Sequence, residues 1–492
     1  MSQIGGNKMS RRQALKIGAV GSLSTLAGGI ALPLSGCASA GSAGSNFAPR
    51  AGGNGQVVRG WEDYPKILAR IQAPVFPAHD FPITQYGATA NGPDATEAIR
   101  KAIDACHAAG GGRVVVPAGI FFTGPIVLKS NVNLHVSEGA TLKFTTDPTQ
   151  YPLMPTRWEG IECINYAALI SALDQENIAV TGKGMLDGQA SKSNWWAWKA
   201  TQTPDQKALI EMGEKGVPVE QRVFGQGHLL RPNFIQPQRC RNILIEDISI
   251  KDSPMWELHP VLSTNVTVRG VKIDSHGPNN DGCDPECCRD VLIENCVFDT
   301  GDDCIAIKSG KNNDGRRVNV PSENIIVRGC LMKDGHGGVV LGSECSGNIR
   351  NVFVENCTMD SPSLDRVLRF KNNAVRGGIL ENVFARNIKV GRVGESVITI
   401  DFLYEEGAKG PFKPIVRNVQ LDNVVANAAP RVMYVVAFEG SIIDQIHISN
   451  SIFKGLEKPE IMANVGRVEF QNVAFVPAKM EVSLSTRPAE LN

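Results

Sequence analysis

Four short motifs in the second half of the sequence contain the residue types that acid–base chemistry requires. They are Asn279-Asn280-Asp281-Gly282, Gly301-Asp302-Asp303, Gly335-His336-Gly337 and Arg369-Phe370-Lys371. Each motif alone has an ordinary explanation, because Asn-Asp-Gly is a common turn and a histidine between glycines is common in loops. The acidic pair is the exception, since two adjacent carboxylates open the apolar run Cys304-Ile305-Ala306-Ile307, where like charges repel.

Strand alternation predicts which of these side chains point outward. If the two isoleucines of that run face the core, Asp302 faces outward, and Asp303 points inward unless the strand starts after it. The same rule sends Arg369 and Lys371 together to the outer face, while their apolar neighbours stay inside. Two cations two residues apart form a site for an anion.

The spacing of the motifs indicates that they come together in space. Asp281 and Asp302 are 21 residues apart, and His336 and Arg369 follow after 34 and 33 more. If each interval is one coil of a stacked structure, the motifs form a column, because neighbouring strands lie about 4.8 Å apart. Carboxylates beside cations suit hydrolysis of a glycosidic bond next to a negatively charged sugar. One acid must keep its proton, and neighbouring carboxylates raise its pKa.

A repeated pattern predicts the stack. A polar residue, four residues with apolar alternation and a small turn-former recur as Asn177-IAVT-Gly182, Asn242-ILIE-Asp247, Asn265-VTVR-Gly270, Asp290-VLIE-Asn295, Asn324-IIVR-Gly329, Asn351-VFVE-Asn356, Asn382-VFAR-Asn387, Asn418-VQLD-Asn423, Gln445-IHIS-Asn450 and Arg467-VEFQ-Asn472. The sixth position is always Gly, Asn or Asp, which tolerate a left-handed backbone. No amphipathic helix is recognised between the strands. We therefore expect an all-β chain folded as a parallel β-helix.

The two ends of the sequence differ from the repeats. A short helix is expected from Asp94 to Ala109, followed by a glycine stop, and would cap the first coil. Residues 56–492 are expected to form a single catalytic domain. Residues 1–37 have the layout of an export signal and resemble a twin-arginine signal ending in a lipobox, Leu34-Ser35-Gly36-Cys37, with lipid on Cys37. An uncleaved anchor helix is the alternative.

Residues 38–55 are rich in Ala, Gly and Ser and are expected to be a flexible tether. The resulting protein would be an exported periplasmic or cell-surface lipoprotein that meets a membrane only through its lipid. Its 50 basic and 50 acidic residues show no basic excess, which argues against a nucleic-acid partner.

Cysteine usage favours buried thiols. Twelve cysteines include Cys37, and three others directly follow the sixth repeat position, where they would stack as small apolar residues. A zinc site from His276 and the cysteines at 283, 287 and 288 is conceivable, but its spacing does not match paired Cys-x-x-Cys motifs. We expect no metal and no cofactor.

As a set, the four motifs resemble those of the polygalacturonases of glycoside hydrolase family 28, whose fold is a right-handed parallel β-helix. The resemblance implies that Asp302 is the general acid, that Asp281 and Asp303 activate water for inversion, and that His336 supports the acid. It also implies pectic oligo- or polysaccharide substrates. Implied and candidate contacts to this substrate are Arg369, Lys371, Asn279, His259, Trp256 and Tyr404. The family more often has Thr where Asn280 stands and Ile where Phe370 stands.

Exo cleavage is the expected mode. The segment Arg157-Trp158-Glu159-Gly160 resembles exo-acting bacterial members, and the 65 residues between the Asn177 and Asn242 repeats could wall off one end of the groove. The three tryptophans at 195, 196 and 198 in that excursion could line a sugar cleft or lie in the core. An endo-polygalacturonase, a rhamnogalacturonan hydrolase, a pectate lyase and a non-catalytic carbohydrate-binding β-helix are the competing functions.

Overall fold

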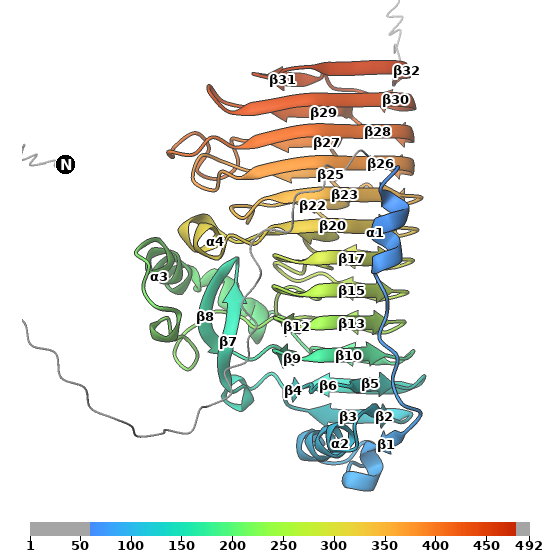
Figure 1. The fold of residues 1–492 in the computed structure, drawn as a ribbon, viewed down its shortest axis with the longest axis vertical. Coiled ribbons are helices and arrows are strands. Elements are labelled where there is room, and N and C mark those ends of the chain that lie inside the picture. The colour runs from blue at the N-terminus through green and yellow to red at the C-terminus, as the bar shows by residue number, and fades with distance from the viewer. Residues whose placement is uncertain (1–59, 479–492) are drawn as a thin grey trace, which may run out of the picture. The chain divides into compact units, whose positions relative to one another are not determined.

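The described part of the computed structural model, residues 60–478, folds as a parallel β-helix, which confirms the expected fold class (Figure 1). The predicted signal segment, the tether and Cys37 lie outside the described residues. The ten sequence repeats form one column of strands, which begins with β1 (Asp80–Pro82) and continues through two further strands before the first repeat. In order, these strands are β2 (Gly112–Val116), β5 (Val132–Val136), β10 (Glu176–Thr181), β13 (Arg241–Glu246), β15 (Thr264–Arg269), β17 (Arg289–Glu294), β20 (Ser322–Arg328), β23 (Ile349–Glu355), β26 (Ile379–Arg392), β28 (Ile415–Ala428), β30 (Ile442–Leu456) and β32 (Val468–Pro477).

Two more columns complete each coil. Short strands after the bend are β3 (Gly119–Thr123), β6 (Ala140–Phe144), β11 (Met185–Asp187), β14 (Ser249–Lys251), β16 (Lys272–Ser275), β18 (Val297–Thr300), β21 (Leu331–Met332) and β24 (Thr358–Met359). The third column contains β4 (Ile126–Val127), β9 (Ile170–Leu173), β12 (Ile235–Gln238), β19 (Ile305–Ile307), β22 (Val339–Leu341), β25 (Arg366–Lys371), β27 (Ser396–Asp401), β29 (Arg431–Val436) and β31 (Ile461–Ala463). Inward-facing aliphatic residues of all three columns form one continuous core.

The sixth position of the repeat is left-handed in all ten copies, as predicted, from Gly182 (φ +107°) to Asn472 (φ +54°). The first position is left-handed as well in nine copies, for example Asn177 (φ +52°) and Gln445 (φ +59°), which the sequence pattern did not predict. Asparagine suits this position for a second reason. Each amide can donate to the residue one coil below, as Asn242 Nδ2 does to Asn177 Oδ1 at 2.8 Å.

The first coil is capped by α2 (Thr96–Ala108), which agrees with the expected helix (Figure 1). It follows β1 (Asp80–Pro82) and a 3-10 turn, η1 (Ile83–Tyr86). A second N-terminal helix, α1 (Tyr64–Arg70), packs on the outside of the stack. Its Tyr64 and Ile67 cover the outward-facing Phe353 and Phe384 of the repeat strands, which explains why those solvent-side positions are apolar. No helix in residues 60–478 has the length and hydropathy to cross a membrane.

The excursion beside the stack contains structure that the sequence pattern did not reveal. Before the first repeat, η2 (Pro148–Gln150) leads into an antiparallel hairpin of β7 (Leu153–Trp158) and β8 (Ile161–Tyr166). After that repeat come η3 (Trp195–Ala200), α3 (Thr203–Glu214) and η4 (Val219–Gln221), and α4 (Asn312–Val318) follows β19. The expectation of no helix between the repeats is therefore wrong at α3 and α4. Both are insertions at the side of the stack and not crossovers between paired strands (Figure 1).

Candidate active site

Three carboxylates from two neighbouring coils meet at the start of β19. One oxygen each of Asp281, Asp302 and Asp303 lies within 4.8 Å of the others. Asp281 and Asp303 are buried, whereas the Asp302 side chain keeps 21% of its surface exposed. The spacing argument predicted that Asp281 and Asp302 meet, and the structure brings them together. Because β19 begins only at Ile305, the side-chain directions of Asp302 and Asp303 are not set by strand alternation.

Asp303 faces the two cations of β25. Its carboxylate is 2.6 Å from Lys371 Nζ and 3.4 Å from Arg369 Nη1. This corrects the expectation that both cations stand on the outer face, because Lys371 is only 6% exposed and its partner belongs to the protein itself. Burial lowers the pKa of Lys371, but the Asp303 carboxylate outweighs it and raises the pKa to about 12.

His336 is the partner of Asp302. Its Nδ1 lies 3.1 Å from Asp302 Oδ1, and this hydrogen bond raises the pKa of the half-exposed imidazole. Burial raises the pKa of Asp302, but the hydrogen bond from His336 and the charge of Lys371 outweigh it, so the pKa falls to about 2. Asp302 is therefore ionised in the free protein.

Of the three acids, Asp281 is the one whose surroundings favour the protonated form. Burial and the nearby carboxylates of Asp284 and Asp302 raise its pKa well above the ordinary value. The expectation that neighbouring acids raise one carboxyl's pKa thus holds for Asp281 and not for Asp302. Two carboxylates so close share a proton, and their titration belongs to the pair.

A buried lysine beneath the acids was not predicted. Lys308 Nζ lies 3.7 Å from Asp281 Oδ2, 3.8 Å from Asp284 Oδ2 and 3.2 Å from Glu344 Oε2. The ammonium also sits 4.3 Å from the centre of the Trp256 ring. A sequence signal existed, because a lysine directly after the buried run of β19 is an unusual place for a charge, and adjacent acids need a counter-ion.

The remaining candidate contacts divide into two groups. Tyr404 lies beside the cations, its ring centre 5.6 Å from Lys371 Nζ, and Asn279 accepts a 2.8 Å hydrogen bond from Arg231. Trp256 and His259 do not line an open groove, since Trp256 is 3% exposed and His259 is fully buried.

His259 is instead hydrogen-bonded to buried polar side chains of the protein. Its Nε2 is 2.9 Å from Glu286 Oε2, and its Nδ1 is held by the side chains of Asn233 and Gln236. The role expected for Trp256 and His259 as direct substrate contacts is therefore wrong in this structure. The zinc set is not brought together either, because the three cysteines are fully buried or nearly so while His276 is half exposed.

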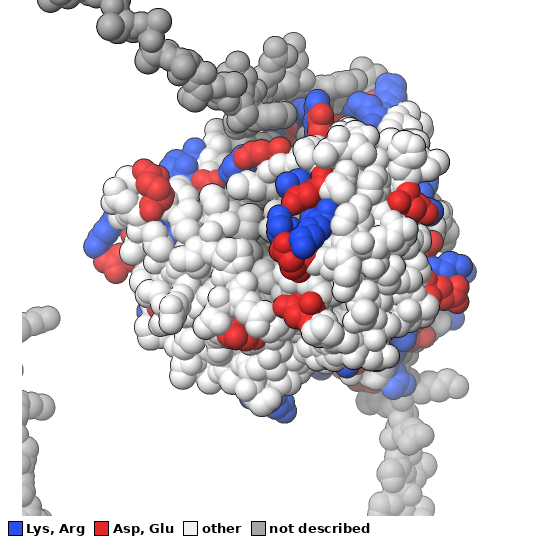
Figure 2. Space-filling view, turned by 90° about the horizontal axis from the view of Figure 1, so that it is seen from below, with Lys and Arg blue, Asp and Glu red and all other residues white. Residues whose placement is uncertain are grey.

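The β7–β8 hairpin, which precedes the Asn177 repeat, is anchored in the charged network of the site. Glu159, in the turn of the β7–β8 hairpin, accepts a hydrogen bond from Lys311 Nζ at 3.2 Å, and Lys311 is 3.8 Å from Glu344. Arg157 pairs with Glu286 at 3.3 Å, both fully buried. Trp195 is 1% exposed and packs on Tyr166, so it belongs to the core. Figure 2 shows basic and acidic side chains gathered in a hollow amid uncharged surface.

Comparison with known proteins identifies the family. The model described as glycosyl hydrolases family 28 matches residues 222–468. The crystal structure of a hyperthermoactive exopolygalacturonase from Thermotoga maritima is 44% identical, with a TM-score of 0.82, over 84% of this chain and 95% of that chain. The chain belongs to glycosyl hydrolase family 28.

Curated relatives agree with this family 28 membership. An exo-poly-alpha-D-galacturonosidase from Dickeya chrysanthemi is 26% identical over 80% of this chain and 70% of its own length. A probable polygalacturonase from Vitis vinifera is 28% identical over 63% of this chain, which spans 60% of that relative. Relatives of similar identity include endo-acting as well as exo-acting enzymes. The family 28 assignment makes the chain a glycoside hydrolase, as the motifs predicted.

Proposed function

We propose that the protein hydrolyses α-1,4 bonds between galacturonic acid residues of pectin or polygalacturonate and releases monomer from chain ends. The observation that carries the proposal is the trio of Asp281, Asp302 and Asp303, with oxygens within 4.8 Å, next to Lys371 and Arg369. The acids supply proton transfer, and the cations select a uronate over a neutral sugar.

Asp302 is the general acid in this proposal. It is the exposed member of the trio, so a leaving oxygen can reach it, but its pKa of about 2 leaves it without a proton in the free enzyme. A bound uronate occupies the cations that hold the pKa down, and it adds negative charge. Both effects favour transfer of the shared proton from Asp281 to Asp302. Asp281 and Asp303 are then the carboxylates that activate water.

We propose that the reaction inverts the anomeric configuration, although the short distance between the carboxyl groups is more typical of retaining enzymes. Inverting glycosidases usually keep their carboxyls about 6.5–9.5 Å apart and retaining ones about 5–5.5 Å. Here Asp303 is held by two cations, and both Asp303 and Asp281 are buried, so both are poorly placed to attack the sugar directly. Proton NMR of the first product decides: β-galacturonate before mutarotation supports inversion, and the α-anomer contradicts it.

The anchored hairpin supports exo action. Glu159 and Arg157 tie the hairpin to Lys311 and Glu286 beside the acids, so the hairpin could close one end of a groove together with the excursion between the Asn177 and Asn242 repeats. Digestion of long polygalacturonate tests it. Monomer as the early product with nearly unchanged viscosity is expected, while a ladder of oligomers would establish an endo enzyme.

The same digestion distinguishes a polygalacturonase from three further kinds of β-helix protein. A pectate lyase would yield unsaturated products that absorb in the ultraviolet and would lose activity with a chelator. A rhamnogalacturonan hydrolase would leave polygalacturonate intact. A non-catalytic binding solenoid would bind oligogalacturonides without forming new reducing ends.

We also propose that residues 1–37 direct export by the twin-arginine route and that Cys37 carries lipid, with residues 38–55 as a tether. The support is the sequence pattern of Leu34 to Cys37. Cys37→Ser protein should leave the membrane fraction. If it remains there, the lipid anchor is excluded.

A further inference from the structure

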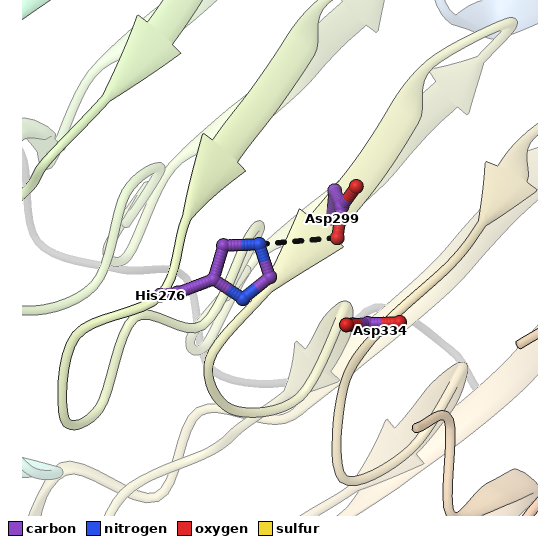
Figure 3. A group of neighbouring side chains, drawn as sticks. All are labelled: His276, Asp299 and Asp334. Atoms are coloured by element: carbon purple, nitrogen blue, oxygen red, sulfur yellow. Dashed lines mark ion pairs between the residues drawn. The ribbon is translucent and has the colours of Figure 1, made fainter. Parts of the chain in front are cut away.

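A second group of potential metal ligands lies outside the proposed catalytic carboxylates. His276, Asp299 and Asp334 each offer one ligand atom, and the three atoms lie within 4.8 Å of one another. Figure 3 shows the three side chains reaching toward one another from neighbouring coils. We propose that these residues bind a divalent transition-metal ion of the zinc type.

The backbone holds the three ligands in place. Asp299 lies on β18, which pairs in parallel with β16 on one side and β21 on the other. His276 directly follows β16, and the Asp334 carbonyl accepts the Thr300 amide at 3.1 Å. Asp299 therefore lies on a strand of one coil, while His276 and Asp334 lie just after the paired strands of the coils on either side.

The distances suit one ion after small side-chain rotations. His276 Nε2 is 3.1 Å from Asp299 Oδ1, which is the separation of two ligands at about 2.0–2.2 Å from a common metal. No separation within the trio exceeds 4.8 Å, and ligands of a tetrahedral zinc lie about 3.3–3.6 Å apart, so side-chain rotation has to close a gap of at most about 1.5 Å. Asp274 Oδ1, 3.5 Å from the same imidazole nitrogen, is available as a fourth ligand.

The charges are unbalanced without a cation. Asp274, Asp299 and Asp334 gather here, and Lys333 approaches only Asp299, at 3.4 Å, through the oxygen that does not contact His276. Among residues 60–478 Asp334 has a hydrogen bond from Ser361 and no ion pair. An imidazole with carboxylates favours zinc or a similar ion, because calcium and magnesium prefer sites made of oxygen alone.

An ion here would act on stability and not on the reaction. Asp299 and Asp334 precede Asp302 and His336 by three and two residues, so the ion would tie together the corners that lead into the catalytic motifs. Metal that binds only the folded state raises the melting temperature by mass action. We expect an increase of about 2–4 °C at zinc 100-fold above its dissociation constant.

The test uses the full-length chain without a histidine tag, stripped with chelator, and zinc chloride as the probe. Bound zinc is counted by mass spectrometry, and melting is followed with and without zinc. Wild type should bind one more zinc than His276→Gln and Asp334→Asn. Zinc should raise the melting temperature of wild type and should not raise that of these two variants. His447→Gln is the matched control, since this histidine also faces an exposed acid, Glu469 at 3.6 Å, and should behave as wild type.

Asp302→Asn shows whether zinc binds at the His276 cluster or at the proposed catalytic carboxylates. If zinc occupied the catalytic trio, this substitution would remove the binding, and the proposal would be overturned. Unchanged zinc stoichiometry in His276→Gln and Asp334→Asn, or no binding by wild type below about 1 mM zinc, would overturn it as well. Because polygalacturonate hydrolysis is measured separately, failure of the metal site leaves the proposed function intact.

Discussion

Lys371 Nζ lies 2.6 Å from Asp303 Oδ2, and both side chains are almost wholly buried. The residue expected to bind the substrate is thus also the counter-ion of Asp303, one of the proposed catalytic carboxylates. A substitution of Lys371 is therefore expected to affect both the buried ion pair and the proposed contact to substrate.

Lys371→Ala should therefore reduce both stability and activity. Removing one member of a buried ion pair leaves the other charged and unpaired, at a cost of about 3–5 kcal/mol in the free energy of unfolding. Chemical denaturation and kinetics on polygalacturonate measure the two losses. The double variant Lys371→Met with Asp303→Asn should regain stability and remain inactive. A single variant with wild-type stability would show that the pair is not formed.

Asp302→Asn should lower kcat by at least about 100-fold, because the proton donor is lost while the side-chain shape is kept. Reducing-end assays on folded protein measure the effect. Asp80→Asn, which alters an exposed ion pair with Arg113 near the cap, is the control and should retain full activity. Near wild-type turnover in Asp302→Asn would exclude it as the acid.

His336 should titrate differently when its partner changes. The Asp302 hydrogen bond raises the pKa of the imidazole in the folded state, so its stabilising contribution is full below pH about 6.5 and is lost as pH rises through the raised value. In Asp302→Asn the pKa should fall toward its ordinary value. NMR titration of the imidazole proton signals, with His447 as internal reference, reports the change. Identical curves in both proteins would contradict the pairing.

Lys308→Met should destabilise the protein more at neutral than at acidic pH. The ammonium lowers the pKa of the buried carboxyls of Asp281, Asp284 and Glu344, so without it all three folded pKa values should rise. A carboxyl with a higher folded pKa loses stability as pH rises above its unfolded pKa, so the deficit in unfolding free energy should grow from pH about 4 to 7. Urea melts of both proteins at several pH values measure it. A deficit independent of pH would rule out the electrostatic role.

Local pattern predicted most of the stack. The left-handed sixth position, the cap helix and the meeting of Asp281 with Asp302 all follow from short stretches of sequence and from motif intervals that each correspond to about one coil. The alignment of the coils follows from strand register, because parallel pairing places equivalent residues of each coil side by side.

What the sequence could not reveal depends on contacts between distant segments. The burial of His259 is decided by Asn233, Gln236 and Glu286, which lie 23 to 27 residues away. The hydrophobic side of α3 was not recognised because the helix packs on an irregular hairpin and not on the regular stack. The expectation of an outward-facing Lys371 failed for the same reason, since its ammonium is paired with Asp303, which lies 68 residues earlier in the sequence.

The eleven cysteines of the described chain are all buried and unpaired, and they are spread from Cys106 in the cap helix to Cys357 in a late coil. A thiol reagent can reach each one only when its own coil opens. The molecule therefore carries a set of internal reporters along its axis. The order in which they become modified under mild denaturant would record whether the solenoid unravels from the cap, from its last coil or all at once.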